Sequence, residues 1–310
     1  MANNEIRTES GSNALDSLCI NGVDMKINEL FEKKKLVLSA EVFPPKTSGT
    51  LELVVRALKD IASCKPDFVS VTCSAGNEMR TEDVATVVKD AFSMECVAHL
   101  TCVNATKASV AERLETLKRK RVDNILVLRG DVRDGDKLTD FHYASELAEF
   151  VKSSCPDFNL IGACYPEGHF EAESLDKDIE NLKRKIDAGV THLVTQLFMD
   201  NEVFYRYLDK LEKAGIDVPV AAGIMPITTT AMIKRTVELS GASMPHRFTA
   251  LAARFEGVAM REAGLNYAVE QITELISRGV RGVHLYTMNK GDVATEVFSR
   301  IEKVAESVRQ

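Results

Sequence analysis

A single carboxyl group lies inside an apolar run near the start of the chain. Glu41 belongs to the run LVLSAEVF (residues 36–43), which two prolines follow directly. Burial in apolar surroundings favours the protonated form of a carboxyl group, so Glu41 is a candidate general acid near neutral pH. For this residue alone, a buried glutamate satisfied by a nearby lysine or by the backbone is an equally good interpretation.

Further polar side chains lie at the carboxyl ends of other apolar runs. They are Thr72, His99, Thr101, Arg129, Asp131, Tyr165, Gln196 and Tyr286. The runs have strand length and span residues 36–43, 67–73, 95–102, 123–130, 159–165, 191–198, 218–226 and 282–288. Amphipathic stretches of helix length separate them, for example at 107–121 and 174–188. This alternation indicates βα units and a parallel sheet, and the carboxyl ends of such strands carry the sites of barrel enzymes.

We therefore predict an α/β fold, a single (β/α)8 TIM-type barrel over residues 26–310 that follows a flexible N-terminal tail over residues 1–25. A doubly wound open sheet is the alternative, because the same alternation builds it. Eight repeats fill the chain without leaving a second domain, which favours the barrel. A longer stretch before the last strand predicts two or three extra helices at about 228–240, 245–254 and 257–278.

Composition excludes several classes of partner. The 46 Asp and Glu exceed the 39 Lys and Arg, and the net charge of −7 disfavours nucleic acid and anionic membrane surfaces. No apolar run is long enough for a membrane span, and seven scattered cysteines without a CxxC pair indicate reduced thiols. We expect a soluble cytoplasmic protein.

The common catalytic motifs are absent from the sequence. There is no GxGxxG fingerprint, so any dinucleotide must be held in another way. Without HExxH, and with six dispersed histidines, no metal site is expected. No GxSxG motif supports acyl transfer through an activated serine.

A set of short motifs, one or more at each strand, makes the sequence recognisable. In chain order they are Glu41–Lys46 (EVFPPK), Ser70–Thr72 (SVT), His99–Cys102 (HLTC), Leu128–Asp131 (LRGD), Tyr165–His169 (YPEGH), Asn181–Gly189 (NLKRKIDAG), Thr195–Phe198 (TQLF), Gly223–Pro226 (GIMP) and His284–Asn289 (HLYTMN). Over residues 26–308 the chain resembles the catalytic barrel of the methylenetetrahydrofolate reductase family, in its bacterial type.

The resemblance implies a barrel that binds FAD without a Rossmann motif. It implies a ping-pong reduction of 5,10-methylenetetrahydrofolate to 5-methyltetrahydrofolate, with NADH or NADPH as co-substrate and the flavin as hydride relay. Glu41 would protonate the leaving nitrogen when the folate ring opens, and Asp131 would stabilise the resulting cation. A homo-oligomer is also implied.

Positions carried over from the family give the remaining site residues. The implied FAD contacts are Thr72, His99, Arg129, Gly130, Asp131, Tyr143, Ala144, Tyr165, His169, Asp178, Asn181, Arg184 and Lys185. The implied folate contacts are Glu41, Asp131, Gln196 and Lys290. Taken alone, Asp178, Asn181 and Lys185 are also typical of a solvated helix face, and Gln196 of a core amide bonded to backbone.

The chain departs from the family pattern at three places. Cys73 and Ser74 follow the second strand, where bacterial relatives commonly have tyrosine, and Ile227–Thr230 replaces a stretch with a stacking aromatic residue. Lys290 takes the place of an arginine, which keeps the charge but loses the bidentate fork. Two other functions stay open: a catalytically silent barrel that binds a partner protein, and a flavin barrel oxidoreductase with a different acceptor.

Overall fold

The computed structural model describes residues 25–45, 51–73 and 80–309. The tail predicted over residues 1–25 lies outside the described residues except for Met25, and so do Lys46 and Ser74.

Eight parallel strands form a closed barrel in chain order, each paired with the next. They are β1 (Val37–Val42), β2 (Phe68–Val71), β3 (Glu95–Thr101), β4 (Asn124–Leu128), β5 (Asn159–Cys164), β6 (Val190–Thr195), β7 (Val220–Ile224) and β8 (Gly282–Tyr286). Parallel pairing of β1 with both β2 and β8 closes the ring. The predicted (β/α)8 barrel is confirmed.

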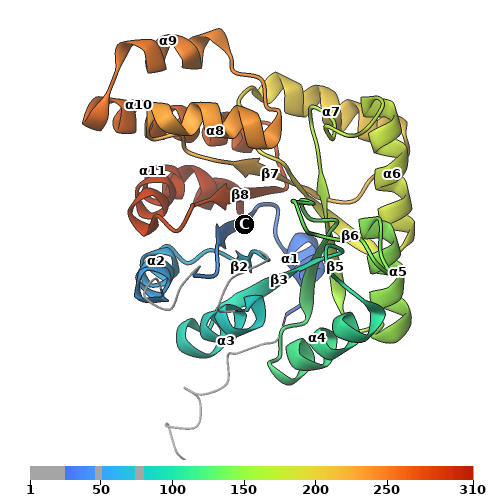
Figure 1. Cartoon of the computed structure of the whole chain (residues 1–310). Helices are drawn as coiled ribbons and strands as arrows, with labels where there is room; N and C mark the ends of the chain where they lie inside the picture. Colours follow the sequence, from blue (N-terminus) through green and yellow to red (C-terminus); the bar gives the residue numbers. More distant parts are fainter. Residues whose placement is uncertain (1–24, 46–50, 74–79, 310) are drawn as a thin grey trace, which may run out of the picture.

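Helices connect the strands around the outside of the barrel (Figure 1). Within the described residues they are α1 (Ile27–Lys33), α2 (Leu51–Ser63), α3 (Thr81–Phe92), α4 (Lys107–Arg119), α5 (Ala144–Ser154), α6 (Leu175–Asp187), α7 (Asn201–Lys213), α8 (Thr230–Ser240), α9 (His246–Arg254), α10 (Gly257–Ser277) and α11 (Gly291–Arg309). Three of them, α8, α9 and α10, form the insertion predicted before the last strand.

Helix α1 closes the end of the barrel where the strands begin, and the sequence analysis did not predict it. Its Phe31 packs with apolar side chains inside the barrel, and the ring lies 5.0 Å from that of His192. The first turn is fixed by Asn124, whose Oδ1 accepts a hydrogen bond from the Ile27 amide at 2.9 Å. With that end closed, the carboxyl ends of the strands form the accessible mouth of the barrel.

The strands themselves are buried on both faces, as expected for parallel strands covered by helices. Every residue of β1, β2 and β7 is buried, and the layer between strands and helices forms one continuous apolar core. Each strand ends one to three residues before the end of the corresponding apolar run. Some polar motif residues, such as Glu41 and His99, therefore lie among the last paired residues of a strand, and others, such as Thr72 and Gln196, lie in the loops that follow.

Candidate active site

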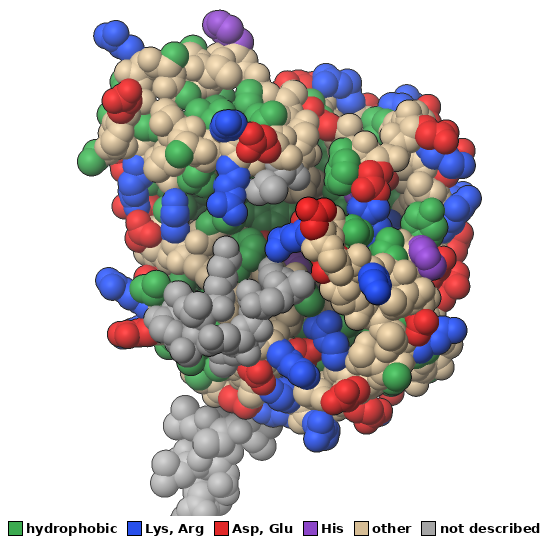
Figure 2. All heavy atoms as spheres, in the orientation of Figure 1, with side chains coloured by type: hydrophobic (Ala, Val, Ile, Leu, Met, Phe, Trp, Pro, Cys, Tyr) green, Lys and Arg blue, Asp and Glu red, His purple; other side chains and the backbone are tan. Residues whose placement is uncertain are grey.

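The mouth of the barrel is a hollow between the strand ends and the α8–α10 insertion. In the space-filling view, basic and acidic side chains lie at its rim and hydrophobic side chains lie deeper (Figure 2). Strand register brings Glu41 of β1 level with Ser70 of β2 and with Tyr286 of β8. Neighbouring strands β8, β1 and β2 thus hold these residues at one level, at or one position before their carboxyl ends.

Glu41 is buried at this mouth, with 6 % of its surface exposed. Its Oε2 lies 3.6 Å from Nε2 of His99 and 3.7 Å from Nε2 of His284. Within the described part of the chain, the carboxylate accepts no hydrogen bond, so the group stays available to a bound molecule. A buried carboxyl that is free to exchange a proton is the arrangement a general acid requires.

Each of the two histidines is held by a serine on the neighbouring strand. The Ser70 hydroxyl lies 2.6 Å from Nε2 of His99, and the Ser39 hydroxyl lies 2.7 Å from Nδ1 of His284. Burial lowers the pKa of His99 to about 4, against the raising effect of Glu41. His99 is therefore neutral at pH 7 and places no cation beside the carboxyl group.

Ser39, Ser70 and His284 were not predicted from the sequence as neighbours of Glu41. A signal for them existed in the sequence. Along a strand, residues two apart face the same side, and Ser39 precedes Glu41 by two positions just as His284 precedes Tyr286. In these strands, the residue two positions before the predicted polar residue also points into the barrel. Applying this rule to the strand ends would have predicted these residues.

The ends of β4 and β5 bring several predicted cofactor contacts together. Lys185 reaches from α6 to donate a hydrogen bond to the Ala163 carbonyl at 2.7 Å, and its ammonium lies 5.9 Å from the centroid of the Tyr165 ring. Burial lowers the pKa of Lys185. The edge of the His169 ring meets the Tyr165 ring, with 4.7 Å between centroids. Lys185 therefore packs inward and does not belong to a solvated helix face.

The loop after β5 is tied to α6 by Asp178. Its Oδ2 accepts a hydrogen bond from the His169 amide at 3.2 Å. Burial raises the pKa of Asp178, while Lys185 opposes that rise. Asp178 and Lys185 lie on the inner side of α6, whereas the neighbouring Arg184 is exposed and Asn181 is partly exposed. Of the four predicted contacts on this helix, Asp178 and Lys185 thus bind groups at the end of β5 and in the loop that follows it.

Two predicted contacts at the strand ends have buried polar atoms without a partner among the described residues. One is the Thr72 hydroxyl, in a residue that is 7 % exposed, and the other is Nε of Arg129. Next to Arg129, Gly130 has a φ of +83°, and a Cβ there would meet Thr101 and Val103 at 3.1–3.2 Å. Unpaired buried donors beside a backbone that only glycine fits agree with a bound polar ligand.

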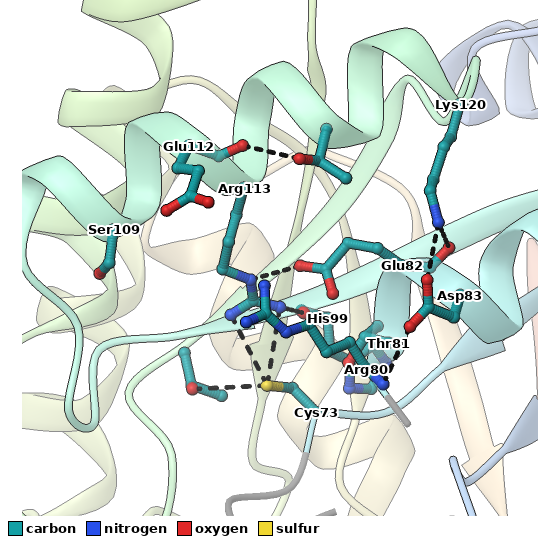
Figure 3. A network of polar contacts seen from close by, with 12 residues as sticks. Cys73, Arg80, Thr81, Glu82, Asp83, His99, Ser109, Glu112, Arg113 and Lys120 are labelled. Atoms are coloured by element: carbon teal, nitrogen blue, oxygen red, sulfur yellow. Dashed lines mark hydrogen bonds and ion pairs between the residues drawn. The ribbon is translucent and has the colours of Figure 1, made fainter. Parts of the chain in front are cut away.

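Cys73 follows Thr72 and takes part in a network of buried polar groups (Figure 3). Its sulfur lies 3.8 Å from both terminal nitrogens of Arg113 and 3.8 Å from the Thr101 hydroxyl. Arg113 also forms an ion pair with Glu82, which is 2 % exposed. This network joins the ends of β2 and β3 to α3 and α4.

Other predicted residues lie nearer the solvent. Asp131 is exposed at the start of the loop after β4, and the side chain of Tyr143 is 65 % exposed. Tyr143 and Ala144 begin α5, where the Glu146 carboxylate accepts a hydrogen bond from the Tyr143 amide at 3.2 Å. The structure places these residues at the rim of the mouth rather than in its buried part.

Two of the four predicted folate contacts, Gln196 and Lys290, follow the ends of β6 and β8. The Gln196 side chain accepts a hydrogen bond from the Leu197 amide at 2.9 Å. The Lys290 ammonium lies 3.3 Å from the Thr228 hydroxyl and 3.7 Å from the Met232 sulfur. Lys290 thus links the start of α11 to the insertion. The apolar cluster of the insertion includes Ile227 and Phe248.

The described residues lack both a metal-binding cluster and a helix that could span a membrane. No group of three or more His, Cys, Asp or Glu side chains is arranged to hold a metal ion in that part of the chain. None of its helices is long and apolar enough to cross a membrane.

Comparison with known structures shows the same architecture. A protein described as "Uncharacterized protein from Clostridium thermocellum binds two copies of 5-methyl-5,6,7,8-tetrahydrofolic acid" superimposes with a TM-score of 0.68. It is 12% identical, and the match covers 91% of this chain and 100% of that chain. At this identity the likeness concerns the fold alone.

Comparison with known sequences gives a closer relationship. The 5,10-methylenetetrahydrofolate reductase of Escherichia coli (strain K12) is 34% identical over 268 aligned residues, and the match covers 83% of this chain and 88% of that protein. Methylenetetrahydrofolate reductase 1 of Schizosaccharomyces pombe is 34% identical over 286 aligned residues, and the match covers 89% of this chain and 47% of that protein. The family model described as methylenetetrahydrofolate reductase matches residues 26–302. With its motifs in order around one barrel mouth, the chain belongs to the methylenetetrahydrofolate reductase family.

Proposed function

We propose that this protein reduces 5,10-methylenetetrahydrofolate to 5-methyltetrahydrofolate with FAD as cofactor and NADH or NADPH as reductant, in a ping-pong sequence. Family membership supports the overall reaction. The observation that carries the proposal is the position of Glu41, a buried carboxyl group at the barrel mouth with two histidines beside it and no hydrogen bond among the described residues.

The donors at the strand ends fit a flavin dinucleotide. The unpaired Thr72 hydroxyl and Arg129 Nε, together with the glycine backbone at Gly130, offer contacts to a polar and anionic molecule. Lys185 adds a buried positive charge near Tyr165. When bound, FAD would supply the hydride chemistry that no protein side chain provides.

The folate presents the protein with a problem of proton transfer. Its one-carbon bridge accepts hydride only after the five-membered ring opens, and ring opening requires a proton at the leaving nitrogen. Glu41 would donate that proton, and the two histidines that flank its carboxyl are themselves fixed by Ser39 and Ser70. His99 is neutral at pH 7 because burial lowers its pKa to about 4. It therefore places no positive charge beside Glu41 that would favour loss of the Glu41 proton before the folate is bound.

The remaining residues would bind and orient the folate. Asp131, at the rim, would stabilise the cation that ring opening leaves on the folate. The Gln196 amide would contact the pterin, and the Lys290 ammonium would attract the glutamate tail through charge.

The test is an anaerobic titration of the purified protein loaded with FAD. NADH or NADPH should bleach the flavin absorbance, and 5,10-methylenetetrahydrofolate should restore it with formation of 5-methyltetrahydrofolate. A protein that holds no flavin would defeat the proposal. Flavin that is reduced by nicotinamide but never reoxidised by the folate would instead support an oxidoreductase with another acceptor.

A further inference from the structure

Arg129, one of the proposed cofactor contacts, is engaged by a carboxylate of the protein itself. Its Nη2 donates to Oε1 of Glu171 at 2.9 Å, and its Nη1 donates to the other carboxylate oxygen. This is a bidentate pair between the end of β4 and the loop that leads from β5 to α6. The hydrogen bond to Arg129 is the main cause that lowers the pKa of Glu171.

The backbone of the Glu171 loop is fixed in a way that aims the carboxylate at Arg129. The Glu171 amide donates to Nδ1 of His169 at 3.2 Å, and the Ala172 amide donates to the His169 carbonyl at 2.9 Å. The His169 amide in turn donates to Asp178 on α6. The loop is thus anchored, while the Glu171 side chain stays 48% exposed and can rotate into solvent.

The surroundings of the pair carry charges of both signs, since Lys185 lies near it together with the carboxylates of Asp131 and Asp178. Arg129 and Lys185 both lower the pKa of His169, although burial is the larger cause, so the two cations lie within electrostatic range of one ring. Carboxylate and phosphate groups use the same pair of guanidinium donors. An anionic ligand that takes both donors of Arg129 must therefore displace Glu171.

We propose that Glu171 holds the place of the cofactor's diphosphate on Arg129 in the cofactor-free protein, and that it thereby limits the affinity for FAD. This inference rests on the proposed function, because it assumes that Arg129 binds the diphosphate. The ion pair is half-exposed and contributes modestly, so the cofactor can displace it. Neutralising Glu171 should strengthen FAD binding about threefold to tenfold.

The experiment compares Glu171→Gln with Glu173→Gln in the full chain. Glu173 lies two positions further on the same loop, is exposed, and forms no ion pair among the described residues. Both variants lose one negative charge, but only Glu171→Gln frees Arg129. The dissociation constant of FAD is measured by fluorescence titration of the apoprotein, and that of inorganic pyrophosphate by calorimetry.

We expect tighter binding of FAD and of pyrophosphate in Glu171→Gln only, and loss of the pyrophosphate site in Arg129→Met. Unchanged or weaker binding of both ligands in Glu171→Gln would overturn the inference, and so would an equal gain in Glu173→Gln. If no form of the protein binds FAD, the proposed function fails. The pyrophosphate titration then decides separately whether Glu171 competes for Arg129.

Discussion

Glu41 on β1 and His99 on β3 approach each other across the mouth of the barrel, with 3.6 Å between the carboxylate Oε2 and the imidazole Nε2. That nitrogen also lies 2.6 Å from the Ser70 hydroxyl. Because burial lowers the pKa of His99 to about 4, this is a contact between a carboxyl group and a neutral ring at pH 7. His99 thus contributes a polar neighbour to the candidate acid but no counter-ion at pH 7.

Glu41→Gln should separate the two halves of the proposed reaction. Glutamine keeps the shape of the side chain but removes its acidic proton. Turnover with 5,10-methylenetetrahydrofolate should fall by about 10²–10⁴-fold, the usual contribution of a positioned acid. Flavin reduction by nicotinamide should stay within about twofold of the wild type, since it needs no proton at the folate. Stopped-flow measurement of each half-reaction checks this, and an equal loss in both would show that the acid lies elsewhere.

The buried histidines should make the protein less stable as the pH falls. Burial lowers the pKa of His192 from 6.5 to about 3. Between these values the unfolded chain binds a proton that the folded protein does not, so the free energy of unfolding decreases as the pH drops below about 6.5. One such group contributes a slope on the order of 1 kcal/mol per pH unit.

His192→Phe keeps a ring against Phe31 and removes the titrating group. Urea unfolding at a series of pH values should show a shallower loss of stability in acid for this variant. His142 is 59% exposed, and His142→Asn should leave the slope as in the wild type. The expectation would be contradicted if His192→Phe lost stability with falling pH as steeply as the wild type.

The sequence predicted the barrel well because each strand is a short apolar run covered on both faces. The apolar runs did not predict the residues at which the strands end. In the run 191–198, pairing stops at Thr195, and Gln196 already belongs to the loop. Apolar character continues beyond the last ladder hydrogen bond, since loop residues such as Phe198 also pack into the core.

Helix α1 escaped prediction for a different reason. It has only seven residues, too few for a clear helical period, and it depends on distant partners. Asn124 binds its first turn from β4, and Arg281 donates to the Phe31 carbonyl from the chain before β8. The pair of Arg129 and Glu171 was likewise invisible, because 42 residues separate its members. Local patterns place residues at an edge of the sheet but do not reveal which charges meet there.

Replacing only one member of the ion pair between Arg113 and Glu82 should lower the free energy of unfolding more than replacing both members. Arg113→Met would leave the Glu82 carboxylate, whose side chain is 3% exposed, without its cation. Loss of one partner of a buried pair costs roughly 3–5 kcal/mol. Adding Glu82→Gln to Arg113→Met should recover a large part of that loss, because the uncompensated charge disappears.

Chemical denaturation of the two single variants and the double variant measures this coupling. Lys177 and Glu180 provide the surface comparison, since their ion pair on α6 is 43% and 63% exposed. Lys177→Met should cost no more than about 1 kcal/mol. If Arg113→Met lowered the free energy of unfolding as little as Lys177→Met, the ion pair with Glu82 would not stabilise the ends of β2 and β3.

Gly223 should tolerate no side chain, because backbone occupies the space beside it. A Cβ at this position would lie 2.3 Å from the Thr195 carbonyl oxygen and 2.7 Å from the Tyr286 ring. The same carbonyl accepts the Tyr286 hydroxyl at 2.6 Å, and the Thr195 hydroxyl accepts the Gly223 amide at 2.9 Å. Gly223→Ala must therefore move β6 or β8 at the mouth of the barrel. We expect a loss of about 1–3 kcal/mol or more in the free energy of unfolding.

Gly162 on β5 provides the matched comparison within the same barrel. A Cβ there would meet the methyl groups of Val190 and Leu193 at 3.0 and 3.2 Å, and these side chains can shift where a carbonyl cannot. Gly162→Ala should therefore be the milder change in thermal unfolding, and it should leave FAD affinity near the wild-type value. Since Tyr286 stands level with Glu41, Gly223→Ala should also impair folate turnover beyond its effect on stability. If Gly223→Ala and Gly162→Ala lowered stability and folate turnover equally, the close approach of Gly223 to the Thr195 carbonyl would not determine the arrangement of the strand ends at the mouth.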